Sequence, residues 1–135
     1  DMVVAKVVSG IYDGIKTEEL DNLSAETCAY MNIVHPDYSK LAARITVSNL
    51  HKNTKDDFYE LLKELNTYRD EQGRDAKLIN DDIIRVMDNE ENRKRIQEAI
   101  KYERDFNFDF FGFKTLEKSY LLKMQGKIAE RPQHM

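Results

Sequence analysis

The sequence predicts a mainly α-helical fold, a bundle-like set of helices with one short β-hairpin near the carboxyl end. Only two prolines and five glycines occur in 135 residues, so few positions interrupt a helix. Apolar residues recur mainly three and four positions apart, which is the spacing of one helical face. The exception lies around Gln125 and Gly126, where two short apolar runs flank a two-residue turn, as in a β-hairpin.

Composition narrows the classes of protein to which the chain can belong. Hydrophobic residues make up 41% of the sequence and charged residues 34%, which is typical of a folded domain. The net charge of −4 argues against a nucleic-acid-binding surface. No apolar run approaches the roughly 20 residues of a membrane span, and one cysteine forms neither an internal disulfide nor a cysteine-rich zinc site. We therefore expect a cytoplasmic protein with no nucleic-acid or membrane partner.

Both ends predict that the chain is a piece of a larger protein. The sequence opens inside an apolar segment, residues 2–8, whose spacing suits either a helix or a strand. Pro132 is a first-turn helix signal, yet the sequence ends three residues later. A natural terminus more often has a polar, solvated stretch.

A long helix is predicted to begin at Thr17, after a short turn at residues 12–16. Thr17 is expected to be its N-cap, and Glu18 and Glu19 follow in the first turn, where carboxylates favour the helix dipole. The helix should end before the His-Pro pair at 35–36. Its apolar stripe consists of Leu20, Leu23, Thr27 and Met31.

Two further helices follow directly. The first runs from Pro36 or Asp37 to about Lys52, and the second starts after Thr54 and Asp57, which resemble a capping box. The predicted buried face of the first consists of Tyr38, Leu41, Ala42 and Ile45. That of the second consists of Phe58, Leu61, Leu62, Leu65 and Tyr68.

Shorter helices follow a polar connection at residues 69–77. Asn80 and Asp81 are the candidate caps of the first of them, and Asn89 is the candidate cap of the second. The phenylalanine-rich run 106–113 favours a buried packing segment over a stacking platform for bases. A last helix is predicted over 115–122, just before the hairpin.

Few residues carry an obvious chemical role. Cys28 is expected to be a small buried side chain, as most free cysteines are. His35, His51 and His134 are single and far apart in the sequence, so no metal site is predicted. The sequence has no glycine-rich phosphate loop and no pattern of catalytic residues. We therefore expect no catalytic residue and no prosthetic group in this chain.

One constellation of residues suggests a nucleotide site. Thr17 opens a helix, where free backbone N–H groups can hold a phosphate. Asp21 follows one turn later and can accept a hydrogen bond from a sugar hydroxyl, whereas Lys52 at the end of the next helix offers an ammonium group to a phosphate. If the two helices pack antiparallel, all three residues surround one pocket.

Several runs of the sequence resemble the large subunit of eukaryotic class I ribonucleotide reductase. Three runs resemble the ATP-cone region of that family, namely residues 12–17 (YDGIKT), 35–44 (HPDYSKLAAR) and 48–52 (SNLHK). The helical segment that follows the cone is resembled by residues 103–106 (ERDF) and 111–122 (FGFKTLEKSYLL). Residues 129–135 (AERPQHM) are similar to the approach to the catalytic barrel of the family.

The resemblance implies that the parent protein is an enzyme. It would reduce ribonucleoside diphosphates to deoxyribonucleotides for DNA synthesis, by means of a thiyl radical that a separate small subunit generates, and its large subunits would self-associate. The cone is implied to be the activity switch, where ATP activates and dATP inhibits, each as a magnesium complex. Thr17, Asp21 and Lys52 match the family positions that contact this regulatory nucleotide.

The resemblance also implies a division of the chain. Residues 1–53 would be the C-terminal part of an ATP cone, and residues 54–135 a helical connecting region that leads toward the catalytic barrel. The first strand segment of the cone and the catalytic barrel match nothing in this sequence, and Cys28 matches none of the catalytic cysteines. The chain alone is therefore expected to lack reductase activity.

Two other functions are weighed against this one. A nucleotide-sensing DNA-binding repressor would need a cysteine-rich zinc ribbon and a basic surface, which one cysteine and a net charge of −4 do not provide. The main alternative is a helical protein-interaction module with no nucleotide site, in which Thr17 and similar polar residues are only helix caps.

Overall fold

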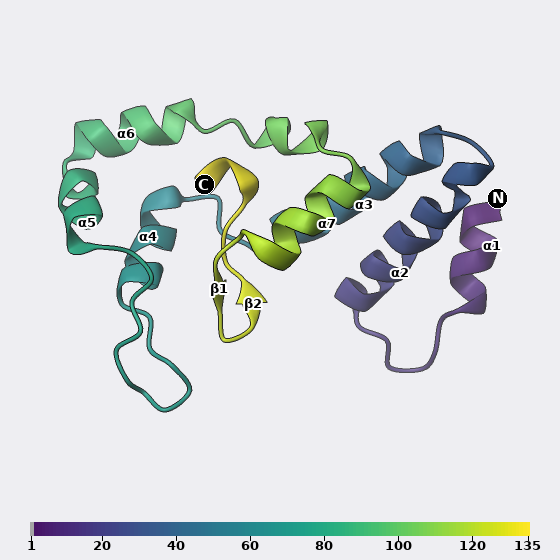
Figure 1. Ribbon diagram of the computed structural model, residues 1–135, viewed down its shortest axis with the longest axis horizontal. Helices are drawn as coiled ribbons and strands as arrows, with labels where there is room; N and C mark the ends of the chain where they lie inside the picture. Colours follow the sequence, from purple (N-terminus) through teal and green to yellow (C-terminus); the bar gives the residue numbers. More distant parts are fainter. Residues whose placement is uncertain (1) are drawn as a thin grey trace.

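Helices form most of residues 2–135, the part of the chain that the computed structural model describes (Figure 1). The α-helices are α1 (Met2–Ser9), α2 (Thr17–Tyr30), α3 (Asp37–Lys52), α4 (Phe58–Asn66), α5 (Asp81–Asp88), α6 (Glu90–Ala99) and α7 (Phe110–Ser119). The 3₁₀ turns are η1 (Met31–Ile33), η2 (Tyr102–Asn107) and η3 (Pro132–His134), and the strands are β1 (Lys123–Met124) and β2 (Lys127–Ile128). The predicted fold class, mainly α with one hairpin near the carboxyl end, is confirmed.

The molecule is elongated, with one group of helices toward each end (Figure 1). In the first group α1 packs on α2, α2 on α3, and α3 on α7. In the second group α5 contacts both α4 and α6. The hairpin and the last residues of the chain lie between the two groups (Figure 1). No helix among residues 2–135 is long and apolar enough to cross a lipid bilayer.

Small side chains allow α2 and α3 to pack closely. Ala25 and Cys28 of α2 and Ala42 of α3 are at most 1% exposed, and Phe110 of α7 covers the same cluster. The predicted burial of Cys28 is confirmed, and this burial raises the pKa of its thiol.

The predicted apolar stripes of α2 and α3 are partly wrong. Met31 is buried, but Leu20, Leu23 and Thr27 are only half-buried, and Leu41 of α3 is exposed. The buried centre of the interface consists of the alanine and cysteine positions, and the longer side chains are more exposed. In α4 the prediction is confirmed for the three leucines at 61, 62 and 65, whereas Phe58 is only half-buried and Tyr68, also half-buried, lies beyond the end of the helix.

The last helix begins earlier than predicted. α7 spans Phe110–Ser119 rather than 115–122, because the carboxylate of Asp109 accepts a hydrogen bond from the N–H of Gly112 at 2.6 Å and caps the helix there. The early start buries Phe110 and Phe113, whereas Phe106, Phe108 and Phe111 are exposed. The predicted burial of the phenylalanine-rich run is therefore correct for two of its five rings.

Other helix starts depend on short polar side chains. Asn80 and Asn89 are the N-caps of α5 and α6, as predicted. The capping box predicted at Thr54 is wrong, since Asp57 is the N-cap of α4 and accepts from the N–H of Glu60 at 2.9 Å. The hydroxyl of Thr54 instead donates to the carbonyl of Leu50, four residues earlier.

The predicted hairpin is confirmed with its turn. β1 and β2 are antiparallel, with Lys123 paired to Ile128 and Met124 to Lys127. Gln125 and Gly126 have φ values of 50° and 74°. Positive φ at both central residues matches the right-handed twist of the strands, which is why a two-residue turn joins them.

Candidate functional site

The antiparallel packing of α2 and α3 brings the start of α2 to the end of α3. Asp21 lies in the second turn of α2, and Lys52 is the last residue of α3. The ammonium group of Lys52 donates to the carboxylate of Asp21 at 2.8 Å, although the two residues are 31 positions apart. The structure thus brings together two of the three residues that the sequence placed at one site.

Thr17 has a different role from the predicted one. It is the first residue of α2, and the N-cap is Lys16. The carboxylate of Glu19 accepts hydrogen bonds from the N–H of Lys16 at 3.1 Å and from the hydroxyl of Tyr12 at 2.9 Å. These bonds, chiefly the one from Lys16, lower the pKa of Glu19. The prediction of Thr17 as the cap is therefore wrong by one residue. The helix start is held by the carboxylate of Glu19, inside the first turn, which accepts from the N–H of the N-cap residue Lys16.

Thr17 still lies beside Asp21. The two residues are four positions apart in α2 and share one helical face, with Thr17 exposed. Within residues 2–135 the hydroxyl of Thr17 is bonded to neither Asp21 nor Lys52. The first N–H groups of α2 have no carbonyl partner inside the helix, as at every helix start.

A cavity of about 210 Å³ adjoins the Asp21–Lys52 pair. Besides these two residues it is lined by Arg44, Ile45 and Ser48 of α3. Arg44, Ser48 and Lys52 are spaced four residues apart, so they form one stripe along the helix. The cavity therefore carries two cations, one carboxylate and one hydroxyl. Arg44 and Ser48 were not predicted as site residues, although they lie eight and four positions before Lys52 and therefore share its helical face.

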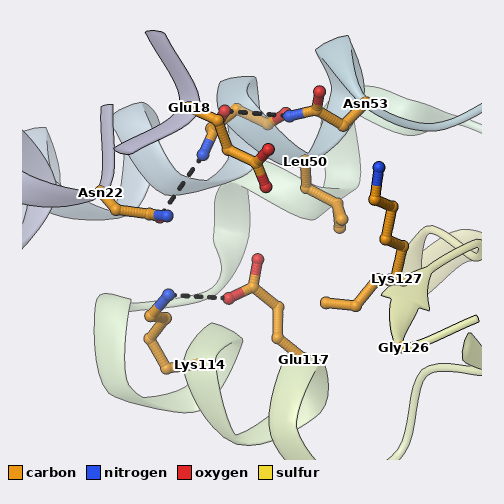
Figure 2. Close-up of a pocket in the computed structure, with 10 residues that line it drawn as sticks. Glu18, Asn22, Leu50, Asn53, Lys114, Glu117, Gly126 and Lys127 are labelled. Atoms are coloured by element: carbon orange, nitrogen blue, oxygen red, sulfur yellow. Dashed lines mark hydrogen bonds and ion pairs between the residues drawn. The ribbon is translucent and has the colours of Figure 1, made fainter. Parts of the chain in front are cut away.

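A second cavity, of about 260 Å³, lies where α2, α3, α7 and the hairpin meet (Figure 2). The amide of Asn49 donates to Asn22 at 3.4 Å and accepts from Asn53 at 3.1 Å. Lys114 forms an ion pair with Glu117 at 3.1 Å (Figure 2). Figure 2 shows Glu18 and Lys127 at the same cavity, where neither side chain bonds another lining residue among those that the structure describes. Most of the remaining polar groups bond one another, and we assign no ligand to this cavity.

A buried polar cluster at the end of α3 was not predicted. Asp105 of η2 is fully buried, and its carboxylate lies 2.8 Å from the Nε2 atom of His51. The rings of Tyr102 and Phe106 contact His51 edge-on, with centroids 6.0 and 5.7 Å away. No local spacing connects these residues, since His51 and Asp105 are 54 positions apart.

The C-terminal residues complete this cluster. The hydroxyl of Tyr102 bonds both the carbonyl of Asp56 and the Nε2 atom of His134, the latter at 2.9 Å. The Nδ1 atom of His134 accepts from the N–H of Arg131 at 3.1 Å, and its ring stacks on Phe58 at 5.1 Å. Burial, with a smaller contribution from Arg131, lowers the pKa of His134 to about 4. The His134 imidazole is therefore neutral at pH 7.

The histidines do not form a metal centre. Among residues 2–135, no group of three or more histidine, cysteine, aspartate or glutamate side chains is arranged to hold a metal ion. His35 lies in the turn before α3, where its Nδ1 atom accepts from the N–H of Asp37 at 3.2 Å.

Comparisons with known proteins identify the family. The chain matches no protein-family profile. It is 54% identical over 133 residues to the ribonucleoside-diphosphate reductase large subunit of Plasmodium falciparum, isolate Dd2. It is 50% identical over 134 residues to the large chain 2 of Saccharomyces cerevisiae and 52% identical over 135 residues to the large subunit of Arabidopsis thaliana. At least 98% of the chain is covered in each case.

The chain belongs to the ribonucleoside-diphosphate reductase large-subunit family. The resemblance noted in the sequence is thereby confirmed. The chain spans about 15% of the length of the curated relatives that it matches. Its one cysteine, Cys28, lies buried between α2 and α3 of this reductase segment.

Proposed function

We propose that this chain is the nucleotide-sensing part of a ribonucleoside-diphosphate reductase large subunit. Residues 1–53, of which the structure describes 2–53, are the C-terminal part of an ATP cone, and residues 54–135 connect it toward the catalytic barrel. The whole enzyme reduces ribonucleoside diphosphates to deoxyribonucleotides with a radical that its small subunit generates. ATP or dATP, with Mg²⁺, is the effector at the cone, and the large subunits self-associate.

The observation that carries this proposal is the 2.8 Å bond between Lys52 and Asp21. In the absence of a nucleotide each group neutralises the other. A bound nucleotide gives Lys52 a phosphate oxygen as its partner and gives Asp21 a sugar hydroxyl. The pair thus exchanges one bond between the helices for two bonds to the ligand.

The charges around the pair favour a magnesium nucleotide over a free anion. Arg44 and Lys52 attract phosphates, and the first N–H groups of α2 beside Thr17 add a further anion-binding surface. Glu18 and Glu19 in the same turn oppose an anion. Mg²⁺ bound to the phosphates reduces this repulsion, since it binds carboxylate and phosphate oxygens.

We propose that this segment regulates the reaction and does not perform it. Radical reduction needs reactive cysteines, and the single cysteine here is fully buried with a raised pKa. The reductase chemistry therefore belongs to the rest of the large subunit.

Calorimetric titration of the chain with dATP and then ATP, each with Mg²⁺, tests the proposal. Lys52→Ala is expected to weaken binding by about 1.5–3 kcal/mol, or roughly 10- to 150-fold, because a charged hydrogen bond is lost. The fold should tolerate the change, since an exposed ion pair contributes about 1 kcal/mol or less to stability. Asp21→Asn should weaken binding as well.

The matched control is Lys40→Ala. Lys40 lies on the same helix and pairs with Asp37 at 3.3 Å, but it is far from Asp21 along α3. Its replacement should leave the affinity unchanged. If neither nucleotide releases heat or raises the unfolding temperature, the chain is a helical interaction module instead, because any ligand of the folded state must stabilise it.

A further inference from the structure

The end of α3 is held by an arginine from the other end of the chain. The guanidinium of Arg131 donates to the carbonyl of His51 at 3.0 Å, and to the carbonyl and hydroxyl oxygens of Thr54 at 2.8 and 2.9 Å. Arg131 is only 7% exposed. The last carbonyls of a helix have no partners inside it, and a cation there also opposes the negative end of the helix dipole. Asn53 and Thr54 bond the carbonyls of Asn49 and Leu50 locally, and Arg131 adds a cap for the carbonyl of His51 from a distant part of the chain.

The same turn is held from a second side. The buried carboxylate of Asp105 bonds the side chain of His51 at 2.8 Å, while Arg131 bonds the carbonyl of that residue. The Arg131 guanidinium also lies over the ring of Tyr102, 4.5 Å from its centroid. We refer to His51, Thr54, Asp105 and Arg131 as the α3 clamp.

Lys52 lies inside the turn that the α3 clamp holds. Its neighbour His51 is fixed through both side chain and backbone, and Thr54 follows two residues later. By contrast, the side chain of Lys52 is 64% exposed, and its ammonium group forms an ion pair with Asp21. The position of its ammonium group therefore depends on how firmly the backbone of this turn is held.

We propose that Arg131 and Asp105 are positioning residues for the nucleotide site: they fix the last turn of α3 and thereby hold Lys52 opposite Asp21. The inference rests on the proposed function of that site. Because coupling between two sites is reciprocal, a nucleotide that engages Lys52 must in turn stabilise the contacts of Arg131 and Asp105. The α3 clamp thus connects the effector site to the segment 102–134.

Hydrogen–deuterium exchange of the ligand-free chain tests the first step. In Arg131→Gln the amides of His51, Lys52 and Asn53 should exchange about tenfold faster or more, while those of α4 keep their rates. Asp105→Asn should accelerate the same amides. Arg85→Gln is the control, since Arg85 forms an exposed ion pair with Asp82 on α5. Unchanged exchange at 51–53 in Arg131→Gln would overturn the inference, whether or not nucleotide binds.

A gentler variant covers the case in which Arg131→Gln does not fold. Thr54→Val removes the hydroxyl that accepts from Arg131 and donates to the carbonyl of Leu50, and it leaves the buried guanidinium bonded to both carbonyls. It should accelerate exchange at residues 51–53 by a smaller factor. Equal rates in Thr54→Val and the wild type would then count against the α3 clamp.

Titration with magnesium dATP tests the second step. At a temperature where all variants are folded, Arg131→Gln should weaken binding by about 5- to 150-fold, whereas Arg85→Gln should not. Faster exchange with unchanged affinity would make the α3 clamp purely structural and overturn its positioning role. No binding to the wild type would refute the proposed function, and the exchange rates would still decide whether the α3 clamp holds Lys52.

Discussion

Glu130, Tyr102 and His134 each have a pKa displaced toward the neutral form, and in each the first cause is loss of contact with water. The pKa of Glu130 is raised even though its carboxylate accepts a hydrogen bond from the N–H of Leu122 at 2.8 Å. At the scale of single residues, burial therefore shifts these pKa values more than the nearby hydrogen-bonding and charged partners do.

The neutral His134 makes stability depend on pH. Its pKa is about 4 in the folded chain and about 6.5 when unfolded, so below pH 6.5 the unfolded chain takes up a proton that the folded chain does not. The contribution of His134 is complete above pH 6.5 and is lost progressively as the pH falls to 4. The loss is at most about 3 kcal/mol. Urea unfolding between pH 4 and 7 measures it.

His134→Gln isolates this effect. Glutamine keeps a neutral polar group and does not titrate, so the variant should lose less stability than the wild type on acidification. His35→Gln is the control, because the side chain of His35 is 62% exposed. Parallel curves for the wild type and His134→Gln would contradict the assignment.

At the scale of elements, α7 shows how one carboxylate fixes the start of a helix. Asp109 caps α7 through the N–H of Gly112, and a Cβ atom on Gly112 would lie only 2.9 Å from the capping oxygen. An alanine at 112 would therefore displace this oxygen from its capping position, although alanine is normally the better helix residue by about 1 kcal/mol.

This arrangement predicts that the effect of Gly112→Ala on stability depends on whether Asp109 is present. Asp109→Ala should destabilise the chain by about 1 kcal/mol. Gly112→Ala should give no gain in the wild type, because the methyl group displaces the cap, yet it should stabilise the Asp109→Ala background by about 0.5–1 kcal/mol. Thermal unfolding of the four proteins gives the result, and equal effects of Gly112→Ala in both backgrounds would contradict it.

Elements that depend on neighbours in sequence were predictable, and those that depend on distant residues were not. The hairpin and the caps at Asn80 and Asn89 follow from local patterns. The start of α7 was predicted too late, because Asp109 lies within the phenylalanine-rich run, which was interpreted as a packing segment and not as the start of a helix. For the site, the α2–α3 hairpin was enough to predict that Asp21 and Lys52 meet. The α3 clamp could not be predicted from local patterns, because Arg131 bonds Thr54 and His51, which lie 77 and 80 positions earlier in the sequence.

At the scale of the whole molecule, the hairpin joins the two groups of helices. Leu121 and Ile128 pack with Val47 and Phe113 of the first group. Met124, Leu122 and Ala129 pack with Leu61 and Leu65 of α4. Both faces of this short segment therefore contribute to a core, which makes one cooperative unfolding unit the expected behaviour.

Gly126→Ala tests this cooperativity. A φ of 74° is strained for alanine by about 1–2 kcal/mol, so the unfolding temperature should fall by a few degrees for probes in both helix groups. Gly73→Ala is the control, since Gly73 has a similar φ of 76° in the exposed loop between α4 and α5. That loop is closed by its own hydrogen bonds, among them those from the Gly73 N–H to Asp70 and from Arg69 to the Gly73 carbonyl, and it joins α4 to α5, so its strain should act first on probes in those two helices. Separate melting of α4–α6 would contradict the conclusion that the hairpin joins the two groups of helices into one cooperative unit.

The burial of Cys28 has a practical consequence. Its thiol lies at the centre of the α2–α3 contact, so a thiol reagent reaches it only when the two helices separate. The rate of modification at this native cysteine therefore reports how often the helix pair opens. While the pair is closed, a cysteine introduced on the surface accepts a fluorophore or spin label selectively, with no need to remove the native one.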